Sequence, residues 1–168
     1  MKNNTKKTIW MFFQEGGTPT NNSFCRHHFL ALEWIKLGYE VKIFVGSFSH
    51  LSSTEVKFNK WFNEEQINGV DYYYVKTPVY SNTSGLVRIY SWLLTSLRLL
   101  FYKAAKGSQP DYLLLSSMPM FAMINALIFK RKYKSKRIIF EKLNFHGLVD
   151  RKKMPEFISK QDIIVYPS

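Results

Sequence analysis

Residues 8–13 read TIWMFF, an unbroken apolar run with the length of a buried β-strand. A polar loop with Gly16 and Gly17 follows, and residues 23–37 then repeat apolar side chains at helical spacing until Gly38 ends the pattern. A strand that enters a glycine loop and leaves along a helix begins many α/β domains that handle nucleotides and phosphates. This stretch therefore predicts the first unit of the fold and a place where a ligand approaches.

The glycine loop has two interpretations. Gly16 and Gly17 can adopt positive φ and let a ligand approach the backbone, so that amide groups at the start of the following helix face an anion. The loop matches neither G-x-G-x-x-G nor G-x-x-x-x-G-K-[ST], which disfavours an NAD site and a P-loop. The other interpretation is that the two glycines only make a tight exit from the strand.

The rest of the chain alternates between strand and helix patterns. Residues 47–67 are polar and are expected to form an irregular surface excursion, and Asn68-Gly69 indicates a turn. Strands are predicted at 39–45, 70–77, 112–116 and 136–141, and helices at 86–102 and 120–129. This alternation predicts a doubly wound α/β domain with a parallel sheet and with its ligand loops at the carboxyl edge of the strands.

Length, charge and cysteine content limit the function classes. The 168 residues allow one domain, or one domain and a fragment, and the 46% hydrophobic content excludes a disordered chain. A formal net charge of +12 indicates a polyanionic partner, although basic runs such as Lys130-Arg131-Lys132 more often serve as solvated faces. The single cysteine, Cys25, excludes a disulfide framework and a zinc site and suits a reducing cytoplasm.

The helix predicted at 86–102 is amphipathic. Its arginines, Arg88 and Arg98, argue against a transmembrane span. Leucine and isoleucine lie on one side, and the two arginines lie on the other with Ser91 and Thr95. The favoured interpretation is an amphipathic helix that covers the sheet, and the alternative is a helix lying on an anionic bilayer. The N-terminal apolar run is too short for a secretion signal.

Short segments along residues 8–141 carry a resemblance to a known family. They are the strand and Gly-Gly loop, Arg26-His27-His28, Leu37–Val41, Gly46–Phe48 with His50, Ile67–Val70, Lys76–Pro78, Pro110–Asp111, Ser116–Pro119 and Phe140–Glu141. In this order and spacing they resemble the N-terminal domain of retaining GT-B glycosyltransferases of family 4, especially bacterial polysaccharide enzymes that use sugar-nucleotide donors.

The resemblance implies a glycosyltransferase of polysaccharide or glycolipid biosynthesis, which transfers a sugar from a nucleotide diphosphate to a lipid-linked or glycan acceptor. It implies a Rossmann-like, doubly wound domain forming the N-terminal half of a GT-B fold. It implies no metal or cofactor, because amides and basic side chains stabilise the departing diphosphate. It assigns no catalytic residue, but it assigns substrate contacts to Gly16, Gly17, Arg26, His27, Ser117, Met118, Pro119 and Glu141. His28 follows His27 on the same helix, so at most one of the two is expected to face the cleft.

The resemblance changes after residue 141. Such enzymes continue with an Arg-Asp and Trp-Pro segment, whereas residues 142–168 resemble the middle of the C-terminal, donor-binding domain. The expectation is an acceptor-side domain at 1–141 joined to an incomplete donor-domain fragment, truncated and inactive alone. The alternative is that 142–168 form only the last strand–helix–strand unit of one small domain.

The expected partners are a sugar nucleotide, the acceptor and an anionic membrane surface, with the protein cytoplasmic and peripheral to the inner face of the membrane. The alternative function is a non-catalytic remnant or basic module that binds an anionic membrane or nucleic acid. Tyr72, Tyr73 and Tyr74 suit base stacking, but no RRM, KH, zinc or helix-turn-helix pattern is present, so nucleic acid is not expected.

Overall fold

The computed structural model describes residues 6–13, 18–19, 26–48, 60–79, 85–105, 108–115 and 120–140. The predicted boundary at residue 142 and the segment 142–168 lie outside these residues. The described elements are, in chain order, β1 (Thr8–Phe13), α1 (Arg26–Lys36), β2 (Glu40–Gly46), β3 (Phe62–Ile67), β4 (Val70–Val75), α2 (Gly85–Leu100), β5 (Tyr112–Leu115), α3 (Met120–Tyr133) and β6 (Arg137–Phe140).

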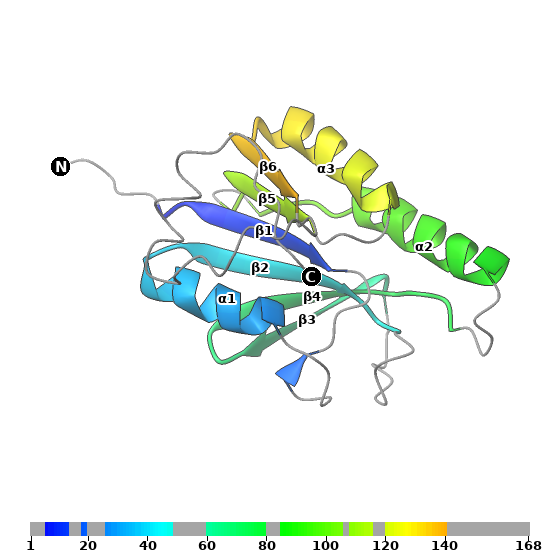
Figure 1. The fold of residues 1–168 in the computed structure, drawn as a ribbon, viewed down its shortest axis with the longest axis horizontal. Coiled ribbons are helices and arrows are strands. Elements are labelled where there is room, and N and C mark those ends of the chain that lie inside the picture. Colours follow the sequence, from blue (N-terminus) through cyan, green and yellow to red (C-terminus); the bar gives the residue numbers. More distant parts are fainter. Residues whose placement is uncertain are drawn as a thin grey trace, which may run out of the picture.

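The strands form one mostly parallel sheet in the order β3-β4-β2-β1-β5-β6 (Figure 1). β1 lies in the centre, pairing in parallel with β2 on one side and with β5 on the other, and β4 and β6 extend the sheet in parallel. The prediction of a parallel sheet built from the runs at 8–13, 41–45, 112–116 and 137–140 is confirmed for the described residues. Since these strands run in one direction, their carboxyl ends share an edge.

The expectation of an irregular excursion over 47–67 is wrong for its last part, because residues 62–67 form β3. This strand pairs antiparallel with β4. The connecting Asn68 and Gly69 both have positive φ, 51° and 82°, as a two-residue hairpin turn of type I′ requires. Side chains also join the two strands, since the Tyr74 hydroxyl donates to Glu65 at 2.7 Å. A polar strand is stable here because it lies at the sheet edge, where both of its faces meet solvent.

Helices cover both faces of the sheet (Figure 1). α1 packs Ala31 and Trp34 onto one face, against Met11 of β1 and its neighbours on β2 and β4. α2 and α3 cover the other face, where Leu99 and Phe129 join a second buried cluster. Alternate residues of each strand point to opposite faces, so a single apolar strand contributes to both clusters.

Trp10 is the centre of the second cluster. Its side chain is fully buried, and five aromatic rings have their centroids between 5.0 and 6.4 Å from its own ring. These rings belong to Phe12, Phe44, Tyr102, Phe129 and Tyr133. Several meet it edge to face, which is a favourable aromatic geometry. The layer between the sheet and α2/α3 therefore depends on one tryptophan.

α2 covers the sheet with its hydroxyl side, not with its apolar side. Its buried residues are Ser91, Thr95, Ser96 and Leu99, whereas its apolar residues Leu86, Val87, Ile89, Tyr90, Leu93 and Leu97 are exposed. The hydroxyl groups turn inward because Ser91 and Ser96 find hydrogen-bond acceptors on other segments there, while Thr95 donates to a carbonyl of α2 itself. Thr95 Oγ1 donates to the Ser91 carbonyl at 2.8 Å, Ser96 Oγ to the Phe121 carbonyl at 3.2 Å, and Ser91 Oγ to the Pro78 carbonyl at 3.3 Å. The favoured interpretation of residues 86–102 as a helix that covers the sheet is thus confirmed, but the side that faces the sheet is the hydroxyl side.

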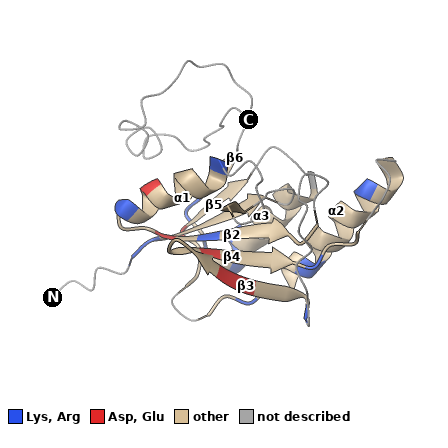
Figure 2. Ribbon diagram, turned by 90° about the horizontal axis from the view of Figure 1, so that it is seen from below, with Lys and Arg blue, Asp and Glu red and all other residues tan. Residues whose placement is uncertain are grey.

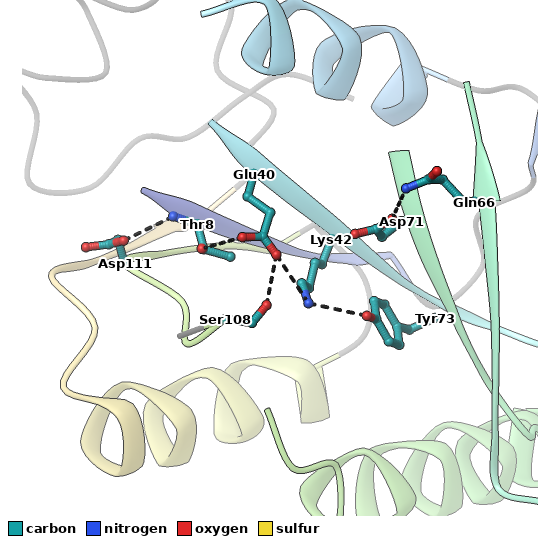
Figure 3. A network of polar contacts seen from close by, with 8 residues as sticks. All are labelled: Thr8, Glu40, Lys42, Gln66, Asp71, Tyr73, Ser108 and Asp111. Carbon is teal, nitrogen blue, oxygen red and sulfur yellow. Dashed lines mark hydrogen bonds and ion pairs between the residues drawn. The ribbon is translucent and has the colours of Figure 1, made fainter. Parts of the chain in front are cut away.

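A network of polar side chains connects neighbouring strands at the amino edge of the sheet (Figure 3). The Glu40 carboxylate accepts from the Ser108 hydroxyl at 2.8 Å and lies 3.4 Å from the ammonium of Lys42, which in turn lies 3.3 Å from the Tyr73 hydroxyl. Burial alone would lower the pKa of Lys42, but Tyr73 and Glu40 outweigh it and raise that pKa above its usual value. At this edge Lys42 is a structural cation, satisfied by its neighbours.

None of the helices in the described parts of the chain is long and apolar enough to cross a lipid bilayer.

Candidate functional site

The carboxyl edge of the sheet is the candidate site. β1, β2, β4 and β5 end there at Phe13, Gly46, Val75 and Leu115, in neighbouring register. The sequence predicted that the loops at 14–17, 46–50 and 116–119 and residue Glu141 share one edge, and the strands that precede them, β1, β2, β5 and β6, do end at one edge of the sheet. Six predicted contact residues lie outside the described residues: Gly16, Gly17, Ser117, Met118, Pro119 and Glu141.

Arg26 and His27 are the predicted site residues that the structure describes, and both lie in the first turn of α1. Arg26 is half-buried, while His27 is only 4% exposed. The imidazole of His27 stacks on the ring of Phe13, with 3.8 Å between the ring centroids. Because Phe13 is the last residue of β1, this contact places His27 at the carboxyl edge, as predicted.

His28 faces the core instead of the edge. Its Nδ1 lies 3.0 Å from the hydroxyl of Tyr72, and the two rings stack with centroids 6.0 Å apart. Burial lowers the pKa of His28 below its usual value, so the neutral imidazole is the folded form at neutral pH. Of the two adjacent histidines, His27 contacts the end of β1 and His28 contacts Tyr72, and both are buried.

Stability is expected to fall as the pH drops below about 6.5, the usual pKa of histidine. Because the folded state holds the pKa of His28 lower than the unfolded chain does, the unfolded chain binds the proton first. The stabilisation is therefore complete above the unfolded pKa and is lost as the pH falls towards the folded pKa. Urea unfolding at pH 7.5 and 5.5 measures this loss. In His28→Gln, which keeps a polar partner for Tyr72, the difference between the two pH values should shrink; an unchanged difference would contradict the assignment.

Hydroxyl groups gather between the ends of β2 and β4 and helix α2. The Ser47 amide donates to Thr77 Oγ1 at 3.2 Å, and the Thr77 amide donates to Ser47 Oγ at 2.8 Å. Thr95 Oγ1 lies 3.2 Å from Thr77 Oγ1, which links α2 to this pair. None of these residues is among the predicted contacts, although Thr77 is the last residue of the strand predicted at 70–77 and Ser47 lies two residues after the strand predicted at 39–45. This position was the signal that could have found them.

A small cavity of about 20 Å³, space for one or two water molecules, lies beside the hydroxyl cluster. Its walls are mostly apolar, from Phe12, Phe44 and Leu99, and polar groups come from Thr95, Ser96 and Asn125. Asn125 is only 1% exposed, and its amide Nδ2 donates to the Ser96 carbonyl at 3.1 Å, which fixes the side chain. A space of this size admits water and is too small for a sugar ring, so the cavity alone is not a ligand pocket.

Within the described ranges, no three histidine, cysteine or acidic side chains come together in a way that could hold a metal ion. The acidic side chains that the structure describes lie mainly on α1, β3, β4 and the amino end of β2 (Figure 2), and none of them lines the cavity. The chemistry available at the described part of the site is therefore hydrogen bonding and aromatic contact.

Comparison of the sequence with models of known protein families finds no match, and comparison with curated proteins finds none at a significant level.

Proposed function

We propose that this domain is the acceptor-side half of a sugar-nucleotide-dependent, retaining glycosyltransferase that makes a polysaccharide or glycolipid and works peripherally at the inner face of a membrane. The observation that carries the proposal is the strand order. Without the antiparallel edge strand, the order β4-β2-β1-β5-β6 has the pattern 3-2-1-4-5 of Rossmann-like sheets, and its direction of winding reverses between β1 and β5. Sheets of this kind bind ligands at the carboxyl edge beside that reversal.

The described side chains at this edge support a sugar-bearing acceptor. The cavity is too small for a sugar, so in this proposal the acceptor lies over the strand ends, where the half-buried Ser47 can exchange hydrogen bonds with sugar hydroxyls. Phe13, half-buried at the end of β1, supplies apolar surface for the ring. In this proposal the diphosphate of the donor is held by a second domain and by the Gly16-Gly17 loop, and the transfer needs no metal ion.

The experiment is an NMR titration of the isotope-labelled protein with a monosaccharide linked through diphosphate to a short alkyl chain, too short to form micelles or to enter membranes. Amide signals of Gly46, Ser47, Thr95 and Asn125 are expected to shift and to saturate. Signals of Glu64 and Glu65 on β3 should stay in place. The proposal is wrong if no signal moves at millimolar concentration, or if the shifts cluster at the amino edge around Thr8.

A pair of serine variants supplies the matched control. Ser47→Ala removes a half-buried hydroxyl from the carboxyl edge and should weaken binding by about 2- to 12-fold, which corresponds to one hydrogen bond of about 0.5–1.5 kcal/mol. Ser108→Ala removes a hydroxyl at the amino edge and should leave the affinity unchanged. Circular dichroism of both variants shows whether the fold is retained. Equal affinities of the two variants would place the acceptor elsewhere.

A further inference from the structure

Two neighbouring helices expose apolar side chains that ordinarily point into a core. On α2 the exposed fractions reach 83% for Leu86 and 59% for Tyr90, and on α3 Met123, Ile124, Leu127 and Ile128 are each at least 40% exposed. Single exposed apolar residues are common on protein surfaces, but a contiguous set of them marks an interaction site. The apolar side of α2 is exposed because the opposite side, which carries the hydroxyl groups, faces the domain interior and is hydrogen-bonded there.

The two sets lie on one surface. α2 and α3 cover the same face of the sheet and are joined by the Asn125–Ser96 and Ser96–Phe121 hydrogen bonds (Figure 1). Each helix directs its buried residues towards the sheet, so the opposite sides of both helices point away from it together. We define the α2/α3 face as the set of exposed side chains Leu86, Ile89, Tyr90, Leu93, Leu97, Met123, Ile124, Leu127 and Ile128.

The charge near this face indicates which kind of partner would bind it. Neither α2 nor α3 contains Asp or Glu, and the exposed run Lys130-Arg131-Lys132 follows directly on the apolar residues of α3. Arg88 and Arg98 lie on the hydroxyl side of α2 and are not part of this face. A second copy of the chain would bring the same cations to this face with no carboxylate to pair with them. Anionic lipid headgroups over an apolar layer complement both properties of the face.

We propose that the α2/α3 face docks on the surface of a bilayer that contains anionic lipid, with the apolar side chains in the boundary between headgroups and acyl chains. This proposal rests on the peripheral membrane location in the proposed function, and it identifies the surface of the domain that contacts the membrane. The first turns of α2 extend past the carboxyl ends of β1 and β2 (Figures 1 and 2). Docking through α2 therefore holds the ligand edge beside the headgroups, where the diphosphate and sugar of a lipid-linked acceptor lie.

Vesicle flotation tests this surface with the full 168-residue chain. Vesicles of phosphatidylcholine with 30% phosphatidylglycerol should bind the protein, and vesicles of phosphatidylcholine alone should bind it far less. Adding 0.5 M salt should weaken binding to the anionic vesicles, because salt screens the headgroup charge. Leu93→Asp combined with Leu127→Asp should reduce the partition coefficient more than tenfold. The matched control is Phe29→Asp, because Phe29 is 64% exposed on α1, which covers the other side of the sheet. The Phe29→Asp protein should bind vesicles as the wild type does.

Charge variants test the electrostatic part separately. Lys130→Gln and Arg131→Gln should each weaken binding about fivefold, the effect of about 1 kcal/mol per basic residue at an anionic surface. Lys36→Gln on α1 removes the same charge on the opposite layer and should have no effect. Near-UV circular dichroism confirms that each variant is folded. Binding that is insensitive to every substitution on the α2/α3 face, or equal on neutral vesicles, overturns the proposal.

Two further outcomes separate this inference from the proposed function. A dimer in sedimentation equilibrium that Leu93→Asp disrupts, without vesicle binding by the wild type, would assign the face to a second copy and overturn the proposal. The soluble acceptor analogue needs no membrane, so its binding should survive Leu93→Asp with Leu127→Asp. If vesicles bind as expected and the analogue does not, the docking surface stands and the glycosyltransferase proposal fails.

Discussion

Replacing Trp10 with alanine is expected to lower the free energy of unfolding by about 3–5 kcal/mol, the usual cost of removing a large aromatic side chain from a core. Trp10 is fully buried between the sheet and the α2/α3 layer, and five rings contact it, so the neighbouring side chains cannot close the cavity without leaving their own positions. Since small domains are stable by only about 5–15 kcal/mol, this change removes much of the total. Urea unfolding followed by far-UV circular dichroism measures it.

Two controls make the result specific to packing. Trp10→Phe keeps most of the ring and removes an indole Nε1 that has no hydrogen-bond partner within the described residues, so it should cost far less than alanine. Trp61→Ala removes a side chain that is 49% exposed and should also have a small effect. A Trp10→Ala protein as stable as either control would show that the layer does not depend on this residue.

The polypeptide of these 168 residues is expected to show no detectable glycosyl transfer, although we propose a glycosyltransferase role for its domain. The described residues form one α/β domain. In the proposed function, the carboxyl edge of this domain contacts the acceptor only. Orientation of donor against acceptor supplies about 7–11 kcal/mol of barrier lowering in well-ordered sites, and a site that holds one partner loses most of it. The rate should then fall by five or more orders of magnitude.

Incubation with radiolabelled UDP- and GDP-sugars and the soluble acceptor analogue measures this directly, with calorimetry for sugar-nucleotide binding. No product is expected in a preparation that still binds the analogue in the NMR titration. Turnover, or micromolar binding of a sugar nucleotide, would show that the donor site is present in this chain. A preparation that binds neither ligand would argue against the function itself.

The parallel strands could be predicted from sequence because burial on both faces demands continuous apolar runs. TIWMFF at β1 and YLLL at β5 leave no polar position for a solvent face. β3 escaped prediction because its sequence, FNEEQI, is polar, and its pairing depends on β4 and the hairpin turn. The positive φ of Asn68 and Gly69 shows that the Asn-Gly pair was itself the hairpin signal.

The orientation of α2 could not be predicted from periodicity. The pattern correctly separates a leucine side from a hydroxyl side, but it does not say which side faces the sheet. That choice depends on partners brought by distant segments, such as the Pro78 and Phe121 carbonyls that accept from Ser91 and Ser96. The sequence of the helix itself does not indicate these partners, so the usual assumption that the apolar side is buried was wrong here.

The candidate site was predictable as an edge and only partly as a set of residues. His27 lies at the carboxyl edge, as the βα pattern indicated, because the helix after β1 must begin there. Asn125 and Thr95 were not selected, since they lie in the middle of helices and meet the strand ends only through the packing of α2 on α3. The loops with the remaining predicted contacts lie outside the described residues.

The sheet also separates two tryptophans that can serve as independent optical probes. Trp34 is buried in the α1 layer and Trp10 in the α2/α3 layer, at 3% and 0% exposure. Their fluorescence and near-UV bands therefore report on opposite sides of one structure. Because Trp61 and Trp92 also fluoresce, the comparison uses proteins in which these two and either Trp10 or Trp34 are replaced by phenylalanine. Such proteins would show whether both layers melt at a single temperature or one of them melts first, and whether a ligand at the strand ends rigidifies one side alone.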